Sequence, residues 1–489
     1  MTVSFALKNN NFLLCKERNS DFFNCYDIGG FKFQYHDRDA VFASDDKKSV
    51  ILFGTIVDSE NYNTSSDDIA HGLLSSKDFS DLIGKSKKLA GRYVIVYCSD
   101  EGLFVLPDAT ASIQVAYSIS SNDLYVSSNP KIIADMNKWQ ESPLSIKIKN
   151  SAHETHPLPY DMSMYDQVKF VIPNHYLDCN AQKMIRYYPL VKTEEITVDA
   201  AASISCKSVN NIILGYMKKY RLSLPLTSGL DSRAILSFCK DKVSEIPVFT
   251  FFHDNFHEET GDIVVPRKIS SAFGLEYHRL NDLELPNELI AAYQTNLGSS
   301  TNLSEAKNAW TYYNSELSQH LRLDGGVIPL AKSNFGGDLP EFLAKPSYFV
   351  TKTHNYSKEN YKEVIRWCKD IRPYVKSSKI SAYDLFFWEH RFGKWSPNSY
   401  LNSDLLAETL NPFNCRELIE TWLQVPRKNR MNKEIHKEII RLNWNELLEF
   451  PFNPGGRFDI VYKHSLLFYI ASKLKFTLER RAFKTKRRL

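Results

Sequence analysis

LSLPLTSGLDSRAILSF, residues 222–238, is the stretch from which the fold can be predicted. Its first five residues are mostly apolar and predict a short buried strand, residues 227–229 predict a tight turn, and Asp231 begins an amphipathic helix. Such a turn directs backbone N–H groups and the positive end of the helix dipole towards one point. We therefore expect an anion site here, of the kind that binds phosphate.

Asp231 would repel a bare phosphate, because its carboxylate lies on the same turn. A magnesium ion between the carboxylate and the phosphate oxygens would remove that repulsion, and proteins usually hold Mg²⁺ through one or two carboxylates plus substrate phosphates. The alternative is an ordinary helix N-cap, since Ser and Asp cap helices in many proteins. On the capping residues alone, the N-cap is the favoured interpretation.

The string Ser228-Gly229-Leu230-Asp231-Ser232 resembles the pyrophosphate loop, Ser-Gly-Gly-x-Asp-Ser, of ATP pyrophosphatases, and of the asparagine synthetase family in particular. Ser228 stands where the family has a glycine, and Pro225 is unusual in a parallel strand because it cannot donate to the ladder. The resemblance implies a parallel-sheet ATP-pyrophosphatase domain with Mg²⁺ on Asp231 and with ATP held by Leu226, Thr227, Ser228, Gly229, Asp231 and Ser232.

The overall composition is that of a globular chain: 489 residues, 43% of them hydrophobic, can bury the cores of two domains. No apolar run is long enough to span a membrane and the first residues do not resemble a secretory signal, so we expect a cytoplasmic protein. Residues 473–489 hold eight Lys or Arg and one Glu. We favour a solvated end over an anion-binding tail for this segment.

Residues 1–190 are rich in short β-branched and aromatic segments between turn residues, which predicts stacked sheets. Strands are expected at 49–53, 92–97 and 102–106, and a helix at 67–74 with Asp67 or Asp68 as its cap.

Three segments of this half resemble core strands of the amidotransferase domain that precedes the synthetase domain in the family: LAGRYVIV at 89–96, LPDAT at 106–110 and VSSNPK at 126–131. The resemblance implies an α+β, N-terminal-nucleophile-hydrolase-like sandwich over 1–190, followed by the ATP-binding domain over 191–489. Working members attack glutamine with an N-terminal cysteine, whereas Met1 is followed here by Thr2. We expect a scaffold without glutaminase activity, with Thr2 as the minor alternative.

From a predicted helix at 198–219 onwards, strand and helix patterns alternate, which favours a parallel sheet. A second strand is expected at 246–252 and a helix at 263–273. Ligands bind beyond the carboxyl ends of strands in such sheets. Thr250 should therefore border the nucleotide base, and the resemblance implies main-chain contacts there. The polar residues at 253–259 are interpreted as a solvated loop rather than a metal site.

Asp324, in HLRLDGGVI at 320–328, matches the family's acid that positions substrate, while Val327 replaces the second metal ligand. Arg457 stands near the place where relatives bring a lysine to the pyrophosphate, with Lys463 as an alternative.

Glu389, in YDLFFWEHRF at 383–392, corresponds to a glutamate that helps deprotonate the attacking amine in relatives that close β-lactam rings. Its phenylalanine neighbours are expected to raise its pKa towards the range of a general base. A structural pair with Arg391 or Lys394 is the alternative.

The resemblance implies ATP-dependent amide-bond formation through an acyl-adenylate, with ATP and Mg²⁺ as cofactors and small-molecule carboxylate and amine substrates. The amine would be ammonia or part of a second substrate. A non-catalytic descendant of the family is one alternative, because the nucleophile and a metal ligand are missing. An RNA-modifying ATP pyrophosphatase is another, although no RNA-binding module is recognisable and nucleic acid is not an expected partner. The sequence leaves the oligomeric state open.

Overall fold

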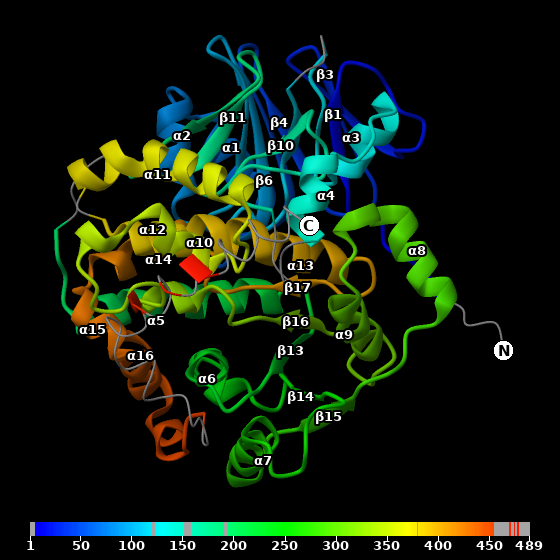
Figure 1. The fold of residues 1–489 in the computed structure, drawn as a ribbon. Helices are drawn as coiled ribbons and strands as arrows, with labels where there is room; N and C mark the ends of the chain where they lie inside the picture. The colour runs from blue at the N-terminus through cyan, green and yellow to red at the C-terminus, as the bar shows by residue number, and fades with distance from the viewer. Residues whose placement is uncertain are drawn as a thin grey trace, which may run out of the picture.

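The computed structural model describes residues 5–119, 123–150, 158–189, 194–378 and 380–453, together with 469–470, 474 and 477–478. Figure 1 shows blue strands at the top, green strands below, and yellow and orange helices between them. We call residues 5–189 the N-terminal half and 194–453 the C-terminal half. The domain boundary expected at 190 lies outside the described residues. No helix in the described ranges is long and apolar enough to cross a membrane.

The N-terminal half is built from two antiparallel sheets, with strand orders β10-β8-β9-β1-β3-β2 and β12-β11-β7-β6-β5-β4. The strands are β1 (Phe12–Cys15), β2 (Asn24–Ile28), β3 (Phe31–Tyr35), β4 (Ala40–Ser44), β5 (Ser49–Asp58), β6 (Leu89–Ser99), β7 (Gly102–Pro107), β8 (Ala116–Ser118), β9 (Val126–Ser127), β10 (Val168–Phe170), β11 (His175–Asp178) and β12 (Lys183–Arg186).

Apolar side chains from both sheets, among them Phe12, Phe53 and Val94, meet in one buried cluster. This arrangement confirms the predicted stacked sheets, and the three expected strands are parts of β5, β6 and β7. Four helices accompany the sheets: α1 (Ser66–Leu74), α2 (Phe79–Ser86), α3 (Pro130–Asn137) and α4 (Pro143–Asn150).

The helix expected at 67–74 is α1, but its predicted cap is wrong. Ser65 is the N-cap, because its hydroxyl accepts the N–H of Asp68 while the Asp68 carboxylate accepts the N–H of Ser65. This is a capping box, in which two terminal N–H groups are satisfied reciprocally.

The C-terminal half contains a sheet of order β15-β14-β13-β16-β17, and every pairing in it is parallel, as predicted. Its strands are β13 (Leu222–Pro225), β14 (Val248–Phe252), β15 (Tyr277–Asn281), β16 (Leu321–Leu323) and β17 (Thr409–Leu410). The helices are α5 (Val198–Met217), α6 (Leu230–Ser237), α7 (Gly261–Phe273), α8 (Asn287–Leu297), α9 (Leu303–Tyr313), α10 (Pro346–Lys352), α11 (Lys358–Ser378), α12 (Ala382–Phe386), a π-helix (Phe387–Trp395), α13 (Ser396–Ser403), α14 (Arg416–Gln424), α15 (Arg427–Met431) and α16 (Glu434–Trp444).

The order of this sheet reverses next to β13. From β13 the chain proceeds through α6 to β14 on one side, and it later returns as β16 on the other side. At such a switch point the two connections leave in opposite directions, so a crevice opens beyond the carboxyl ends of the strands. The turn after β13 and the residues after β16 both lie at this crevice.

Buried polar contacts join the two halves. Arg92 of β6 donates two hydrogen bonds to the Asp404 carboxylate, at 2.8 and 2.7 Å, and Arg38 donates to the same carboxylate at 2.9 Å. The Asn414 side chain donates to the carbonyl of Gly91 at 2.6 Å. Gly91 has a φ of +125°, and a Cβ there would stand 2.2 Å from the carbonyl oxygen of Thr55, so only glycine fits.

Candidate active site

A cavity of about 800 Å³ lies at the carboxyl edge of the parallel sheet. Strand-end residues Pro225, Phe249, Phe251, Leu323 and Thr409 form part of its wall. The helices contribute Lys352, Phe387, Arg391, Phe392, Trp395 and Tyr400, and Phe335 comes from a turn. Two of the acids singled out in the sequence, Asp231 and Asp324, also line it. We call this space the sheet-edge cavity.

Asp231, in the first turn of α6, is bound by two basic side chains. Its Oδ1 accepts a hydrogen bond from Nζ of Lys332 at 2.5 Å and one from Nε2 of His436 at 3.0 Å. Burial alone would favour the neutral acid, but the His436 hydrogen bond and the Lys332 charge outweigh it, so the pKa of Asp231 is far below its usual value. Asp231 is therefore a carboxylate whose charge is compensated by the protein.

His436, on α16, is completely buried. Burial, with the nearby Lys332 charge, lowers its pKa to about 4, so the ring is neutral at pH 7. A carboxylate cannot donate, so Nε2 carries the proton that Asp231 accepts. Nδ1 then bears a lone pair, and it has no hydrogen-bond partner in the described part of the chain.

These residues do not fit the magnesium site predicted at Asp231. The Lys332 ammonium occupies the position next to the carboxylate where the cation was expected, and Val327 is a buried core residue. Within the described ranges, no group of three or more His, Cys, Asp or Glu side chains could hold a metal ion. A hard divalent cation needs several oxygen ligands. The predicted metal position is thus filled by a protein cation.

The N–H groups of the turn after β13 are not free, contrary to the prediction. The N–H of Thr227 donates to the Ser232 hydroxyl at 3.1 Å, and that of Gly229 donates to the Thr227 hydroxyl at 3.2 Å. Ser228 donates its N–H and its hydroxyl to Oδ1 of Asp262, at 2.8 and 2.6 Å. Asp262 belongs to the first turn of α7. A carboxylate therefore already lies where the turn was expected to receive phosphate.

Leu226 and Thr250 connect the ends of β13 and β14. The Thr250 hydroxyl donates to the Leu226 carbonyl at 2.7 Å, and both residues are buried. Neither side chain lines the sheet-edge cavity. The structure thus brings the two residues together through a contact with each other, and their expected contacts with a nucleotide stay a prediction.

Arg233 is a buried residue of the same stretch that the sequence analysis did not single out. Its guanidinium donates to the carbonyl oxygens of Ser228 at 3.0 Å and Phe450 at 2.8 Å, among others. It thereby holds the segment 447–453 against the turn. Three predicted positions, Arg457, Lys463 and Thr2, lie outside the described residues.

Asp324, directly after β16, forms a pair with a tyrosine. Its Oδ2 accepts a hydrogen bond from the Tyr400 hydroxyl at 2.7 Å, and its Oδ1 accepts the N–H of Gly326 at 2.8 Å. Burial and the adjacent carboxylate raise the pKa of Tyr400 well above its usual value. Both side chains line the sheet-edge cavity, so this acid and tyrosine face its contents together.

Glu389 does not line the sheet-edge cavity, and the expected rise in its pKa is wrong. It is buried, and its carboxylate accepts hydrogen bonds from Arg186 at 2.5 and 2.9 Å, Trp367 at 2.8 Å and Asn174 at 2.9 Å. Burial raises the pKa, but the Arg186 charge and hydrogen bonds outweigh it, so the pKa is lowered.

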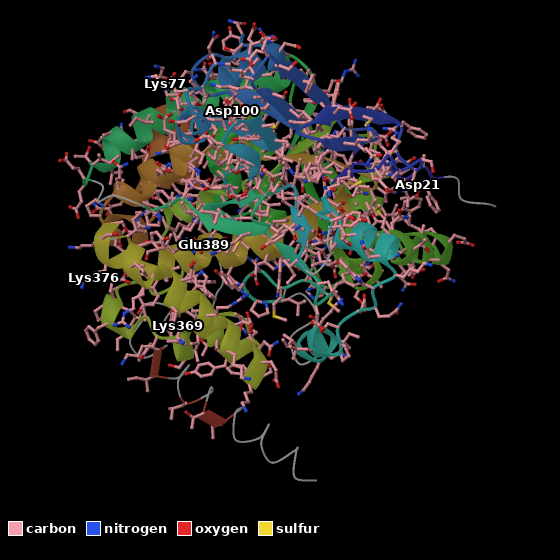
Figure 2. The ribbon with its side chains drawn as sticks, turned by 90° about the horizontal axis from the view of Figure 1, so that it is seen from above. Asp21, Lys77, Asp100, Lys369, Lys376 and Glu389 are labelled. Carbon is pink, nitrogen blue, oxygen red and sulfur yellow. The ribbon has the colours of Figure 1, made fainter. Side chains whose placement is uncertain are left out.

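Figure 2 places Glu389 within the packed interior, whereas Lys369 and Lys376 lie on exposed parts of α11. The structural alternative also needs correction, because the ionic partner of Glu389 is Arg186 rather than Arg391 or Lys394. This geometry is that of a buried structural ion pair.

The sequence analysis did not identify three residues of the site, namely Lys332, His436 and Tyr400, and it considered Arg391 only as a partner of Glu389. Lys332 comes directly after the 3-10 helix Ile328–Ala331 that follows β16, and a cation in the segment after such a strand is a signal that could have been used. Arg391 stacks on the indole of Trp395, with 3.6 Å between the guanidinium carbon and the ring centroid. Nothing in the sequence near His436 or Tyr400 points to the site.

No protein-family model and no curated protein matches the sequence. Among solved structures, the glutamine-dependent NAD⁺ synthetase of Acinetobacter baumannii matches with a TM-score of 0.21 and 9% identity over 40% of this chain and 45% of that protein. An allosteric regulatory enzyme of purine biosynthesis matches with a TM-score of 0.25 and 8% identity over 55% of this chain and 59% of that protein. The NH₃-dependent NAD synthetase of Campylobacter jejuni gives a TM-score of 0.21 and 15% identity over 49% of this chain and 94% of that protein.

This chain therefore spans less than two thirds of the length of the first two of these proteins. None of the three is described as an asparagine synthetase. Similarities of this strength establish neither a family nor a function for the chain.

Proposed function

We propose that the chain is an ATP-dependent carbon–nitrogen ligase of the asparagine synthetase type, which activates a small carboxylate and transfers it to an amine. One observation carries the proposal: Asp231 of α6 and the Asp324–Tyr400 pair line one cavity at the switch point of a parallel sheet. Nucleotides bind at this place in open α/β sheets. The cavity volume of about 800 Å³ falls within the usual range for small-molecule sites.

The finer fold assignment belongs to the same proposal. Two antiparallel sheets followed by a parallel sheet support an N-terminal-nucleophile-hydrolase-like half followed by an ATP-pyrophosphatase-like half. The proposed nitrogen donor is ammonia or an amine of a second substrate.

The reaction has two steps. In the first, a carboxylate oxygen attacks the α-phosphorus of ATP, the bond to the bridging oxygen breaks, and pyrophosphate leaves with the electron pair. In the second, the amine nitrogen attacks the acyl carbon, the carbon–oxygen bond to AMP breaks, and the nitrogen loses a proton. Negative charge grows on the leaving pyrophosphate in the first step, and a proton must be accepted in the second.

Cationic side chains of the cavity are suited to the first step. Lys332, Lys352 and Arg391 all line it, alongside Asp231 and Asp324. Positive groups fixed near developing negative charge are usually the largest single contribution to such transfers. Lys332 is also held in place by Asp231, so its ammonium is positioned before substrate binds.

The Asp324–Tyr400 pair is suited to the second step, in the role that the sequence analysis gave to Glu389. Asp324 remains a hydrogen-bond acceptor, and Tyr400 fixes one of its oxygens through the 2.7 Å hydrogen bond. A positioned carboxylate can accept the proton of the attacking amine. In this scheme Asp324 is the base and Tyr400 orients it.

The proposal is tested by ATP–pyrophosphate exchange with the full chain and a panel of small carboxylates, with reactions lacking carboxylate as the control. We expect exchange that depends on one chemical class of carboxylate, and AMP release when an amine is added. Absence of exchange with every carboxylate, despite measurable ATP binding, would overturn the ligase assignment.

A non-catalytic scaffold is the second candidate, and one observation favours it. The turn's N–H groups and Asp231 are all engaged by protein groups, so the site is internally satisfied without a ligand. This candidate requires that ATP does not bind. Equilibrium binding of a fluorescent ATP analogue distinguishes the two, since the ligase requires saturable binding that unlabelled ATP displaces.

A further inference from the structure

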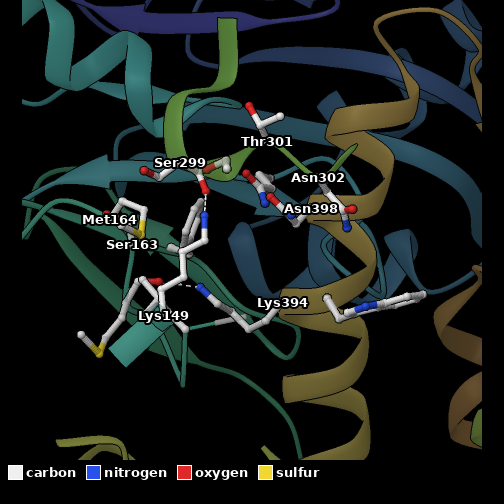
Figure 3. Close-up of a pocket in the computed structure, with 14 residues that line it drawn as sticks. Lys149, Ser163, Met164, Ser299, Thr301, Asn302, Lys394 and Asn398 are labelled. Atoms are coloured by element: carbon white, nitrogen blue, oxygen red, sulfur yellow. Dashed lines mark hydrogen bonds between the residues drawn. The ribbon is translucent and has the colours of Figure 1, made fainter. Parts of the chain in front are cut away.

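A second cavity, of about 90 Å³, lies between the two halves and is shown in Figure 3. The N-terminal half contributes Gln114, Lys149 and Ser163, and the C-terminal half contributes Asn302, Lys394 and Asn398. The side chains of Lys149 and Lys394 both reach into it. We call it the two-lysine cavity. It is distinct from the sheet-edge cavity, although Trp395 borders both.

Lys394, in the π-helix, is 5% exposed. Its Nζ donates to the Met162 carbonyl at 2.7 Å and lies 4.0 Å from the centroid of the Phe170 ring. It forms no ion pair with any residue that the structure describes. Burial lowers its pKa to about 7. A buried amine without a carboxylate partner is costly unless something else compensates its charge.

Lys149, at the end of α4, supplies a second amine that lines the two-lysine cavity. Its Nζ donates to the backbone carbonyl of Ser299 and, like Lys394, it is in no ion pair with a described residue. Burial lowers its pKa as well. None of the residues that line the two-lysine cavity is Asp or Glu, so two amines share a small space that contains no acid.

Gln114, which lines the two-lysine cavity and also a smaller one, has a buried polar atom without a partner in the ranges that the structure describes. The residue is 9% exposed and its Oε1 has no hydrogen-bond partner among the described residues. Buried side-chain amides almost always have a partner. Its amide can present either its oxygen or its N–H groups to a ligand, because the two ends are nearly the same shape.

We propose that the two-lysine cavity binds a small oxyanion, such as inorganic phosphate or a short carboxylate. Two ammonium groups, with side-chain amides and hydroxyls around them, supply charge-assisted donors to oxygen atoms. The volume of about 90 Å³ corresponds to about three water molecules at ~30 Å³ each, which suits a group of four or five non-hydrogen atoms. The site is independent of the proposed ligase function.

Anion binding here is coupled to proton uptake. An anion next to Lys394 raises the pKa of the amine, so above pH 7 binding draws a proton from solvent. The charged groups that act on Lys394 are Asp161, which favours its protonated form, and Lys169 of β10, which opposes it. Lys149 lines the same cavity, and Glu141 favours the protonated form of that lysine. Affinity should fall as the pH rises from 7 to 9.

The experiment is isothermal titration of the full chain with sodium phosphate and, separately, sodium acetate, with sodium chloride at equal ionic strength as the control. We expect saturable binding of at least one oxyanion and none of chloride. Titrations at pH 8 in two buffers of different ionisation enthalpy should show proton uptake. Lys149→Met and Lys394→Met should each weaken binding by about tenfold or more, since each removes a charge-assisted hydrogen bond.

Lys207→Met is the matched control, because Lys207 is an exposed lysine of α5 and its replacement makes the same change in charge. If phosphate binds and acetate does not, the site is specific for inorganic oxyanions. If only acetate binds, the site is specific for carboxylates. If both bind, the site recognises the oxygen atoms that the two anions have in common. Binding no stronger than that of chloride, or binding that survives both lysine substitutions, overturns the proposal. If Lys394→Met does not fold, the proposal is tested by the anion affinity of Lys149→Met and by the proton uptake of the unmodified chain.

Discussion

Nζ of Lys332 lies 2.5 Å from Oδ1 of Asp231, so a protein ammonium compensates the carboxylate that the sequence assigned to magnesium. The lysine ends the 3-10 helix Ile328–Ala331 that follows β16, and the aspartate lies in the helix after β13, the neighbouring strand at the switch point of the sheet. Their contact therefore joins the segments that follow these two strands, at the edge of the sheet-edge cavity. It also positions the Lys332 ammonium at the cavity where pyrophosphate is proposed to leave.

Lys332→Met should abolish most ATP–pyrophosphate exchange, with a loss of about 10²-fold or more, because a fixed positive group next to developing charge is removed. Lys332→Arg keeps the charge and should retain part of the activity. Exchange rates of both variants, measured alongside their thermal unfolding, check this. Full activity of the Met variant would exclude Lys332 from the proposed first step.

Asp262→Asn should tighten ATP binding by about tenfold, since it removes a negative charge that lies 2.8 Å from the N–H of Ser228, where phosphate is proposed to bind. Asp254→Asn is the matched control, because Asp254 is an exposed acid shortly before α7. Competition binding with a fluorescent ATP analogue measures both. Weaker binding in Asp262→Asn alone would mean that the carboxylate supports the turn rather than blocks it.

The strand, turn and helix around Asp231 could be predicted because their signals are local: an apolar run, small turn residues and a helix start within a few positions. The partners of the site could not. Lys332 and His436 are 101 and 205 residues from Asp231 in the chain. Sequence periodicity does not reveal contacts between residues so far apart. From the sequence alone, an aspartate that is paired with a lysine therefore cannot be distinguished from an aspartate that binds a metal ion.

Glu389 is a second residue whose role depends on a partner far away in the sequence. The pattern at 383–392 predicts a helix, and the structure confirms it with α12 and the π-helix. The role of Glu389, however, depends on Arg186, which is 203 residues away. Apolar neighbours in sequence suggested a raised pKa, but the side chain meets a guanidinium in space, and a nearby opposite charge lowers the pKa of an acid. Local composition therefore gave the wrong sign.

Glu389→Gln should lower the free energy of unfolding by about 3 kcal/mol, because it removes the more buried of the two carboxylates, Glu389 and Asp370, that compensate the charge of Arg186. Both proposed half-reactions should be affected alike, since Glu389 does not line the sheet-edge cavity. Denaturant unfolding and separate assays of exchange and amide formation test this. A selective loss of amide formation, with unchanged stability, would return Glu389 to the mechanism.

Tyr400→Phe should slow amide formation by up to about 10²-fold while exchange persists, because Asp324 loses the hydrogen bond that orients it. Tyr293→Phe is the control, since Tyr293 is a buried tyrosine whose hydroxyl has no partner in the described ranges. Comparing the two steps in each variant separates orientation from general loss of packing. Equal losses in exchange and amide formation would argue against the role of Tyr400.

The last prediction concerns pH and Lys394. Its pKa is about 7 in the folded chain, whereas an exposed lysine titrates near 10.4. Between these values the unfolded chain holds one more proton at this site, so the contribution of Lys394 to stability rises with pH, by up to about 1.4 kcal/mol per pH unit. Below pH 7 both states are protonated and the contribution is constant.

Lys394→Met should therefore remove this rise and be most stabilising, relative to the unmodified chain, at or below pH 7. Denaturant midpoints of both proteins at pH 6, 7, 8 and 9 in chloride salts test it, with oxyanion buffers avoided because the two-lysine cavity is proposed to bind them. The denaturant midpoints of Lys207→Met, which changes an exposed lysine, should depend on pH in the same way as those of the unmodified chain. If the midpoints of Lys394→Met change with pH in the same way as those of the unmodified chain, the amine is charged throughout this range. That result would refute both its lowered pKa and the proton-coupled anion binding.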